Sequence, residues 1–203
     1  MTRTLAARFG RLIGSASAGA GIVNRYEEPH RRYHTVEHLR EVLAAFDGLA
    51  DLAADPVAVE LAVWFHDTVY DPTAFGGWNE SASAELAAEA LTELGVDAGR
   101  VAEVARLVEL TADHAVEPGD VNGAVLADAD LTIFSAPPDR YARYATDVRA
   151  EYAHVDDDAW RRGRLAVLDA FLSRPRLYLT DRAHSMCDTA ARRNLAAELV
   201  ALR

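Results

Sequence analysis

The sequence contains no lysine, and all 21 of its basic residues are arginine. A Walker-type phosphate loop, a Schiff-base enzyme and a Ser-Lys dyad each need an amine at the centre of their chemistry. The composition therefore excludes these three classes. Any grip on a phosphate group by a basic side chain falls to arginine, whose planar guanidinium matches two phosphate oxygens.

Cysteine and long apolar runs are also scarce. The single cysteine, Cys187, can form neither an internal disulfide nor a zinc knuckle, and we expect it to be a small structural residue. No run approaches the roughly 20 apolar residues that a bilayer span needs. Residues 1–30 lack the basic start and compact apolar block of a signal peptide. We therefore expect a cytoplasmic location and no membrane partner.

The charge balance is acidic, with 32 acidic against 21 basic residues and a formal net charge of -11. An acidic surface disfavours nucleic-acid polymers and anionic membranes, because it cannot neutralise their phosphates. The length of 203 residues suffices for one complete core. We expect a single domain over residues 1–203, with its main motifs in residues 33–134 and C-terminal helices over residues 138–201. A homodimer is compatible with such a compact chain.

Apolar residues recur at three- and four-residue spacing through most of the chain, and strict alternation is rare. This pattern predicts an all-α fold, a single-domain helical bundle. The expected helices cover residues 3–26, with a break between Gly14 and Gly21, and residues 35–49, 56–69, 80–94, 97–112, 124–134, 138–154, 157–172 and 183–201. Asp55 and Asp97 are expected to cap two helix starts, and Gly95 a helix end.

Histidines and carboxylates gather at two places in the first half of the chain. His34 and His38 stand four residues apart, so they share one helical face, and Asp67 directly follows His66. In an antiparallel hairpin turning near residue 52, residues at equal depth have numbers that sum to about 105. His38 then lies level with Asp67, so His38, His66 and Asp67 reach one height on neighbouring helices. Histidine and aspartate are side chains that bind divalent metals, and the spacing therefore indicates a metal site. Alternatively, His66 and Asp67 form an ordinary helix C-terminus, where the dipole favours an imidazolium.

Two further acids, Asp128 and Asp130, lie among apolar residues in the segment AVLADADLTIF. Buried carboxylates are seldom found without a metal or another cation as partner. Asp130 therefore completes a set of four candidate ligands with His38 and the His66-Asp67 pair.

The order of these ligands in a helical chain resembles the HD superfamily of metal-dependent phosphohydrolases, and in particular a compact bacterial subgroup of predicted phosphohydrolases. The similarity extends over about residues 25–200, through YHTVEH, AVWFHDTVYDP, NESASA, LTADH, DADL, VRAEY and ARRNLAAEL. The resemblance implies an HD-type fold and ligation by His38, His66, Asp67 and Asp130.

The same resemblance implies a cofactor and an activity. The cofactor is one divalent ion or two, drawn from Mn, Fe, Co, Ni, Zn and Mg. The activity is hydrolysis of a phosphate ester or anhydride of a small molecule, for example a nucleotide, by a metal-activated water. Asp67 is expected to hold that water as well as the metal.

Moving a proton near the reacting water needs a further carboxylate, for which Glu80 and Asp71 are the candidates. Each also has an ordinary structural role open to it. Glu80 stands where it can satisfy a helix N-terminus, and Asp71 can cap a turn before Pro72.

His34, His114 and Arg32 are candidates for contacts with the substrate or with the metal ligands; either histidine could instead bind a second metal, and Arg32 is the arginine closest in sequence for gripping a phosphate. For His34 the alternative is a capping or solvent-facing residue, and for His114 a loop residue at a helix end. Arg31 and Arg149 are further candidates for the phosphate grip. The histidines that match no ligand pattern are expected at the surface: His30, His154 and His184. Aromatic residues near the motifs could stack on a base or form core: Tyr33, Trp64, Phe65, Tyr70 and Trp78.

Two other functions compete with phosphohydrolysis. A di-iron oxygenase of the same superfamily usually carries two additional histidines between the His-Asp pair and the last Asp, and only His114 occupies that interval here. A regulatory or ligand-binding module would keep the fold without catalysis, since fold alone does not establish activity.

Overall fold

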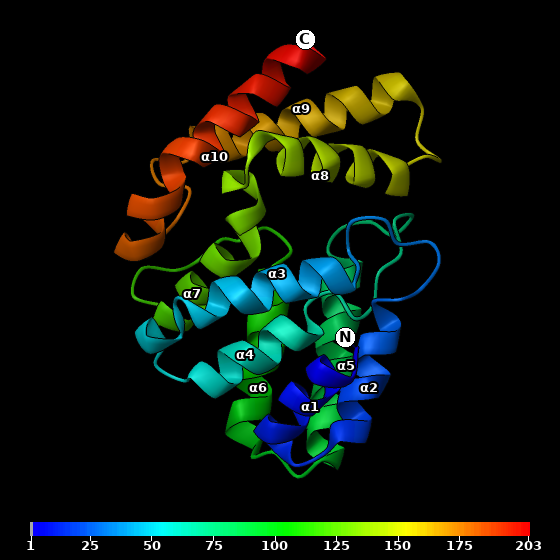
Figure 1. The fold of residues 1–203 in the computed structure, drawn as a ribbon, viewed down its shortest axis with the longest axis vertical. Coiled ribbons are helices and arrows are strands. Elements are labelled where there is room, and N and C mark those ends of the chain that lie inside the picture. Colours follow the sequence, from blue (N-terminus) through cyan, green and yellow to red (C-terminus); the bar gives the residue numbers. More distant parts are fainter. Residues whose placement is uncertain (1) are drawn as a thin grey trace.

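Ten α-helices and two 3₁₀ helices make up the regular structure of residues 2–203, the part of the chain that the computed structural model describes (Figure 1). No strand occurs among these residues, which confirms the all-α prediction. The helices are α1 (Thr2–Ile13), α2 (Ala16–Arg25), α3 (Val36–Asp47), η1 (Ala50–Leu52), α4 (Pro56–Phe65), α5 (Trp78–Glu93), α6 (Ala98–Leu110), α7 (Val121–Asp130), η2 (Leu131–Ser135), α8 (Pro138–Glu151), α9 (Asp157–Ser173) and α10 (Asp181–Leu202).

Local sequence signals set several helix ends as predicted. The Asp55 carboxylate accepts hydrogen bonds from two amides of the first turn of α4, and Asp97 accepts one at the start of α6. Gly95 follows α5 with φ of 76°, in the left-handed region that glycine enters without strain. Gly14 has the same φ and separates α1 from α2, at the predicted break.

Two helices end at residues other than those predicted from the sequence. We expected α4 to continue to residue 69, but it ends at Phe65, because the Thr68 amide and hydroxyl both bond back to the Phe65 carbonyl and tighten the chain into a turn. The predicted helix over residues 124–134 is α-helical only to Asp130 and continues as the 3₁₀ helix η2. Both changes of geometry occur at a candidate metal ligand or beside one.

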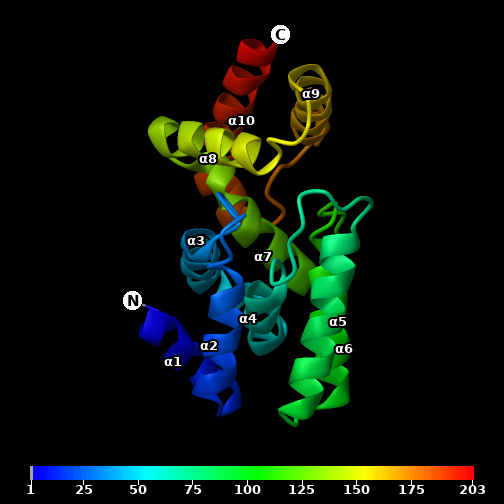
Figure 2. The same cartoon turned by 90° about the vertical axis from the view of Figure 1, so that its right-hand side faces the viewer.

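The helices form a central group with hairpins beside it and a layer across one end (Figures 1 and 2). Helices α3, α4 and α7 pack against one another in the centre. The α1–α2 and α5–α6 hairpins lie on opposite sides of α4 (Figure 2). Helices α8, α9 and α10 form the layer across the α3 end, and η2 joins that layer to the centre. No helix in the described part of the chain has the length and apolar character needed to cross a membrane.

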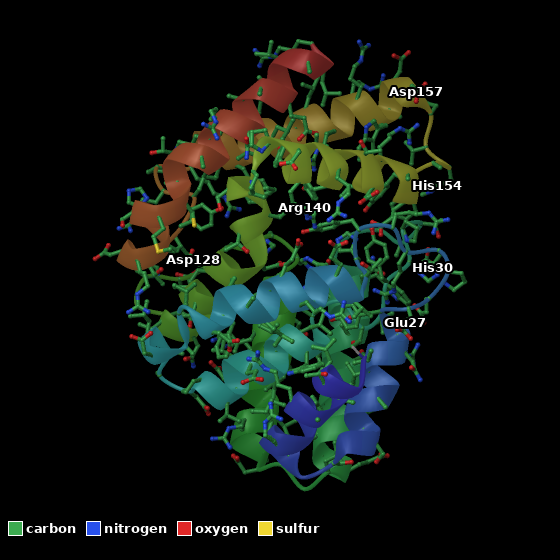
Figure 3. All side chains as sticks on the ribbon, viewed as in Figure 1. Glu27, His30, Asp128, Arg140, His154 and Asp157 are labelled. Carbon is green, nitrogen blue, oxygen red and sulfur yellow. The ribbon has the colours of Figure 1, made fainter. Side chains whose placement is uncertain are left out.

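One continuous hydrophobic core runs through the centre and into the C-terminal layer. The apolar stripe of α3 is buried throughout: Val36, Leu39, Val42, Leu43 and Phe46. Polar contacts fix the layer in place. Arg140 of α8 pairs with Glu41 of α3, and the Asp128 carboxylate accepts hydrogen bonds from the amides of Leu179 and Thr180 (Figure 3).

Candidate metal centre

The first turn of α3 and the end of α4 bring two histidines together. His38 and His66 are almost completely buried, and their Nε2 atoms lie 3.1 Å apart. Asp67 reaches the same point, with its Oδ2 3.2 Å from His38 Nε2 and 3.0 Å from His66 Nε2. The antiparallel hairpin therefore sets these residues at one depth, as the numbering predicted.

The turn after α4 allows adjacent residues to face one site. Adjacent residues in a helix point roughly 100° apart, so His66 and Asp67 could not converge in a continuing helix. The Tyr26 hydroxyl donates to the carbonyl of Trp64 and accepts from the Asp67 amide. The buried Arg31 guanidinium donates to the carbonyls of Asp67 and Thr68. Tyr26 and Arg31 thus hold the backbone that aims the His-Asp pair.

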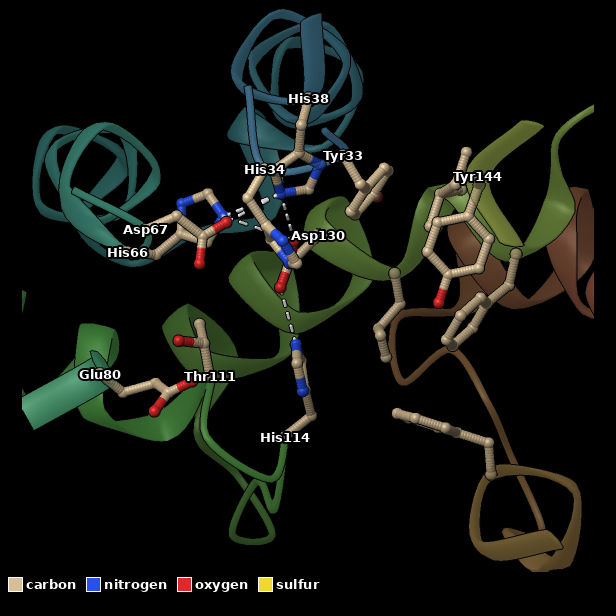
Figure 4. Close-up of a pocket in the computed structure, with 14 residues that line it drawn as sticks. Tyr33, His34, His38, His66, Asp67, Glu80, Thr111, His114, Asp130 and Tyr144 are labelled. Carbon is tan, nitrogen blue, oxygen red and sulfur yellow. Dashed lines mark hydrogen bonds and ion pairs between the residues drawn. The ribbon is translucent and has the colours of Figure 1, made fainter. Parts of the chain in front are cut away.

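Asp130, the last residue of α7, supplies a fourth potential metal ligand. Its Oδ1 lies 3.3 Å from His38 Nε2 and 3.5 Å from His66 Nε2 (Figure 4). The tightest group consists of His38, His66 and Asp67, whose ligand atoms all lie within 4.8 Å of one another. This group could hold a metal ion, and Asp130 borders it on the side of α7.

The hydrogen bonding of His66 fits a cation at this point. Its Nδ1 lies 2.9 Å from the carbonyl oxygen of Val63, which can only accept, so Nδ1 carries the proton. In a neutral ring Nε2 then presents its lone pair to His38 and the two carboxylates. A backbone bond of this kind commonly fixes the tautomer and orientation of metal-binding histidines. Two nitrogens and two carboxylates are a suitable donor set for a borderline divalent ion.

The buried charges at the site support one another electrostatically. Burial alone would raise the pKa of the Asp67 carboxyl, but the neighbouring imidazoles, His66 first, hold that pKa well below its usual range. The same balance, again with His66 as the largest favourable contribution, lowers the pKa of Asp130. Burial opposes a positive charge on His66, yet Asp67 and Asp130 raise the pKa of its imidazole well above the ordinary value. The site therefore favours ionised carboxylates and a positive charge between them.

His114 lies beside Asp130, which the hairpin argument did not locate. Its Nε2 is 2.8 Å from Asp130 Oδ2, the carboxylate oxygen turned away from His38 and His66 (Figure 4). The backbone of His114 has φ of 53°, the only positive φ outside glycine among the described residues. Such a conformation costs energy and tends to persist at functional sites. His114 is thus placed to orient Asp130.

His34 is held by a carboxylate from the C-terminal layer. Its Nδ1 lies 2.7 Å from Glu151 Oε2, which also accepts a hydrogen bond from the Tyr70 hydroxyl. The other oxygen of Glu151 accepts from three successive amides, those of Arg32, Tyr33 and His34. These bonds lower the pKa of Glu151 to about 2 against the effect of its burial, with the His34 ring the largest favourable contribution. His34 keeps Nε2 available to the cavity that it lines.

Of the two proposed acid-base carboxylates, only Glu80 lines the cavity at the metal centre (Figure 4). Asp71 is exposed, and its Oδ1 accepts from the amide and hydroxyl of Thr73. That is the turn-capping role weighed as its alternative. Asp71 is therefore not brought to the site.

The three arginines proposed for phosphate contact also lie outside the cavity lining. The Arg32 side chain is exposed and donates to the carbonyls of Pro29 and Arg31, so its part at the site is limited to its backbone amide. Arg31 is buried in the structural role described above. Arg149 bonds to the chain segment after α8 and to Asp157.

The remaining candidate residues divide between the core and the surface. Trp64 and Phe65 are core residues with almost no exposed surface, whereas Trp78 is half exposed. His30 and His154 are exposed as expected, and His184 is partly exposed.

The cavity has an aromatic wall that sequence reasoning missed. Three rings of the lining come from η2, α8 and α9: Phe134, Tyr144 and Phe171. Tyr144 lies on the side of the cavity away from Asp67 and Glu80 (Figure 4). In the sequence these residues follow the spacing of core positions, and nothing there distinguishes them. The expectation of a metal or another cation beside Asp128 was wrong, because the backbone amides just before α10 donate to its buried carboxylate.

Comparison of the chain with models of known protein families, with curated proteins and with solved structures gave no match.

Proposed function

We propose that the protein is a metal-dependent phosphohydrolase of the HD type that acts on a small phosphorylated molecule. One observation supports the proposal most strongly: ligand atoms of His38, Asp67 and Asp130 all lie within 3.5 Å of His66 Nε2, and the four residues line one cavity. These are the four residues, in the chain order, on which the resemblance to that superfamily rests.

The four ligand residues fit a divalent ion drawn from Mn, Fe, Co, Ni, Zn and Mg. When bound, such an ion supplies Lewis acidity at a phosphoryl group. The protein contributes orientation, because the Val63 carbonyl fixes the His66 ring and His114 fixes the Asp130 carboxylate.

Proton transfer falls to the groups that line the cavity beyond these ligands. The Glu80 carboxylate can accept a proton from an attacking water. Because Nδ1 of His34 faces Glu151, Nε2 of the same ring is free to exchange a hydrogen bond or proton with a substrate oxygen. Both groups line the same cavity as the candidate metal ligands.

The test is elemental analysis and turnover of the protein purified without chelator, compared with His66→Ala, Asp130→Ala and the control His154→Ala. His154 is exposed and lies outside the cavity, so its loss leaves the site unchanged. We expect stoichiometric metal and phosphate release from the parent and from His154→Ala only. Folded parent protein that binds no metal would refute the proposal. Metal retained without turnover on any phosphate compound would instead support a ligand-binding module.

A further inference from the structure

The cavity at the metal centre has two chemically different halves (Figure 4). One half carries the histidines and the three carboxylates of Asp67, Glu80 and Asp130. The other half is apolar and aromatic. A molecule that fills the cavity must therefore present a polar group to one side and an apolar group to the other.

The aromatic half is a continuous wall rather than scattered rings. The ring centroids of Tyr33 and Tyr144 lie 4.7 Å apart, and those of Phe134 and Phe171 lie 4.9 Å apart. Phe134 also packs edge-on to Tyr144, at 6.1 Å, which joins the two pairs. Leu131 and Ile133 complete the lining on this side. Three of these rings are buried, and Phe171 keeps part of its surface open.

The lining offers a substrate no unpaired positive charge, because each of its four histidines already faces a carboxylate: His34 faces Glu151, His38 and His66 face Asp67, and His114 faces Asp130. Among the described residues no arginine lines this cavity. Four arginines contact lining residues, and all are occupied. Arg164 pairs with Glu198 and Arg140 with Glu41, whereas Arg31 and Arg174 donate to backbone carbonyls. One divalent ion would offset only two of the three carboxylate charges. A polyphosphate with several negative charges would meet like charge without compensation.

The cavity is also small. Its volume is about 180 Å³, below the roughly 300–1,000 Å³ typical of sites for drug-sized ligands. That space suits one phosphoryl group and one ring-sized apolar group.

We propose, on the basis of the proposed function, that the substrate is a compact phosphate ester of low charge whose alcohol part carries an aromatic or similarly flat apolar group. The phosphoryl group lies toward the histidines and carboxylates, and the apolar group lies against Phe171 and its neighbours. Phe171 is thus a specificity-determining residue. Nucleoside triphosphates and other polyphosphates are poor substrates.

The test separates binding from turnover. Calorimetry on the manganese-loaded protein compares benzylphosphonate with ethylphosphonate, which share a phosphonate head and differ in the ring. We expect benzylphosphonate to bind roughly 10- to 100-fold more tightly, the range that one stacked ring contributes. In parallel, kcat/KM is measured for benzyl phosphate, ethyl phosphate and pyrophosphate, and benzyl phosphate should rank first.

Variants of Phe171 locate the preference. Phe171→Ala should weaken benzylphosphonate binding about tenfold and change ethylphosphonate binding less than about twofold, with Phe171→Leu intermediate. The matched control is Phe75→Ala, the same substitution at a phenylalanine that is 91% exposed and outside the cavity lining. It should behave as the parent does. If Phe171→Ala fails to fold, the inference is still tested by Phe171→Leu and by the affinity of the parent for benzylphosphonate relative to ethylphosphonate.

Three outcomes would overturn this inference: equal affinity of the parent for the two phosphonates, faster turnover of pyrophosphate than of benzyl phosphate, or an equal loss of affinity for both phosphonates in Phe171→Ala. Hydrolysis of phosphates with any of these outcomes would leave the proposed function standing. Absence of turnover on all phosphates, with metal bound, would remove the proposed function and with it any substrate.

Discussion

The carboxylate of Glu151 and the pair of carboxylates of Asp67 and Asp130 differ in how they are satisfied. Glu151 accepts five hydrogen bonds, three from backbone amides and one each from His34 and Tyr70. Asp67 and Asp130 Oδ1 face only the Nε2 atoms of His38 and His66 within the described structure. Those two nitrogens also face each other, and a neutral His66 ring has no proton there to donate.

The difference separates a structural charge from a functional one. The protein itself meets every lone pair that Glu151 needs, so this carboxylate stabilises the fold with no outside partner. At the metal centre the carboxylates of Asp67 and Asp130 face imidazoles, which can match them only by taking up protons, as the raised pKa of His66 reflects, and which can release those protons when a cation binds. Such an arrangement is costly unless a cation binds, and it suits a ligand-binding point better than a structural one.

The largest expected effect comes from removing charge at the metal centre. Asp130→Asn should lower metal affinity by more than about 100-fold and abolish phosphate release, because it removes one of two carboxylate ligands. The metal-free variant should lose less stability than Glu151→Gln does, because the imidazoles that face Asp130 can release a proton when its charge is removed, whereas the backbone amides that face Glu151 cannot. Calorimetric metal titration and urea unfolding measure the two effects. A large loss of stability without metal would show that Asp130 resembles Glu151 after all.

The opposite behaviour is expected at Glu151. Glu151→Gln should reduce the free energy of unfolding by about 2–4 kcal/mol, because two charge-assisted acceptors become an amide with a donor facing Tyr70 and His34. The folded variant should still bind stoichiometric metal. Loss of metal from a folded variant would contradict the separation of the two groups.

Acid titration provides a second measure of Glu151. Its pKa falls from 4.5 to about 2 on folding, so the stabilisation is complete above pH 4.5 and is lost as the pH falls toward 2. The shift corresponds to something on the order of 3 kcal/mol. The difference in unfolding free energy between the parent and Glu151→Gln should therefore shrink between these pH values. A difference independent of pH would indicate a packing effect.

A smaller effect is expected at His114, which contacts a ligand from outside the tightest group. His114→Ala should weaken metal binding roughly 10- to 100-fold, as losses of residues that orient metal ligands commonly do. His114→Asn should keep the backbone better, since asparagine tolerates a positive φ. If both variants lost metal equally, the side-chain bond to Asp130 would be the cause. Unchanged affinity in both would remove His114 from the site.

The smallest effect is expected at Asp71, outside both groups. Asp71→Asn should change kcat/KM by less than about twofold and leave the thermal unfolding midpoint almost unchanged, because its carboxylate caps only an exposed turn. Steady-state kinetics on the best substrate of the parent measures this. A large loss of activity would return Asp71 to the catalytic candidates.

The sequence was most informative where geometry follows from spacing. Antiparallel helices of known length fix relative depth, which is why His38 could be matched with residues 66 and 67 from numbering alone. Helix capping by Asp55 and Asp97 is a local effect, and both predictions were confirmed.

Sequence reasoning failed where contacts join distant segments. Glu151 contacts residues almost 120 positions earlier, and a glutamate on a helix carries no mark of such partners. The same applies to Phe171, whose spacing on α9 is that of a core residue. Asp128 and Asp130 look alike in the sequence, yet residues about 50 positions later satisfy only Asp128.

The long-range contacts of Glu151 also affect the order in which the protein folds during synthesis. During synthesis, the segment through η2 leaves the ribosome with all four candidate metal ligands, but without the acid that gathers the amides of residues 32–34. His34 can take its position only after α8 has been translated and has docked. Such long-range contacts are slow to form and come late in folding. A nascent chain stalled before α8 should thus be able to capture metal before its cavity is complete.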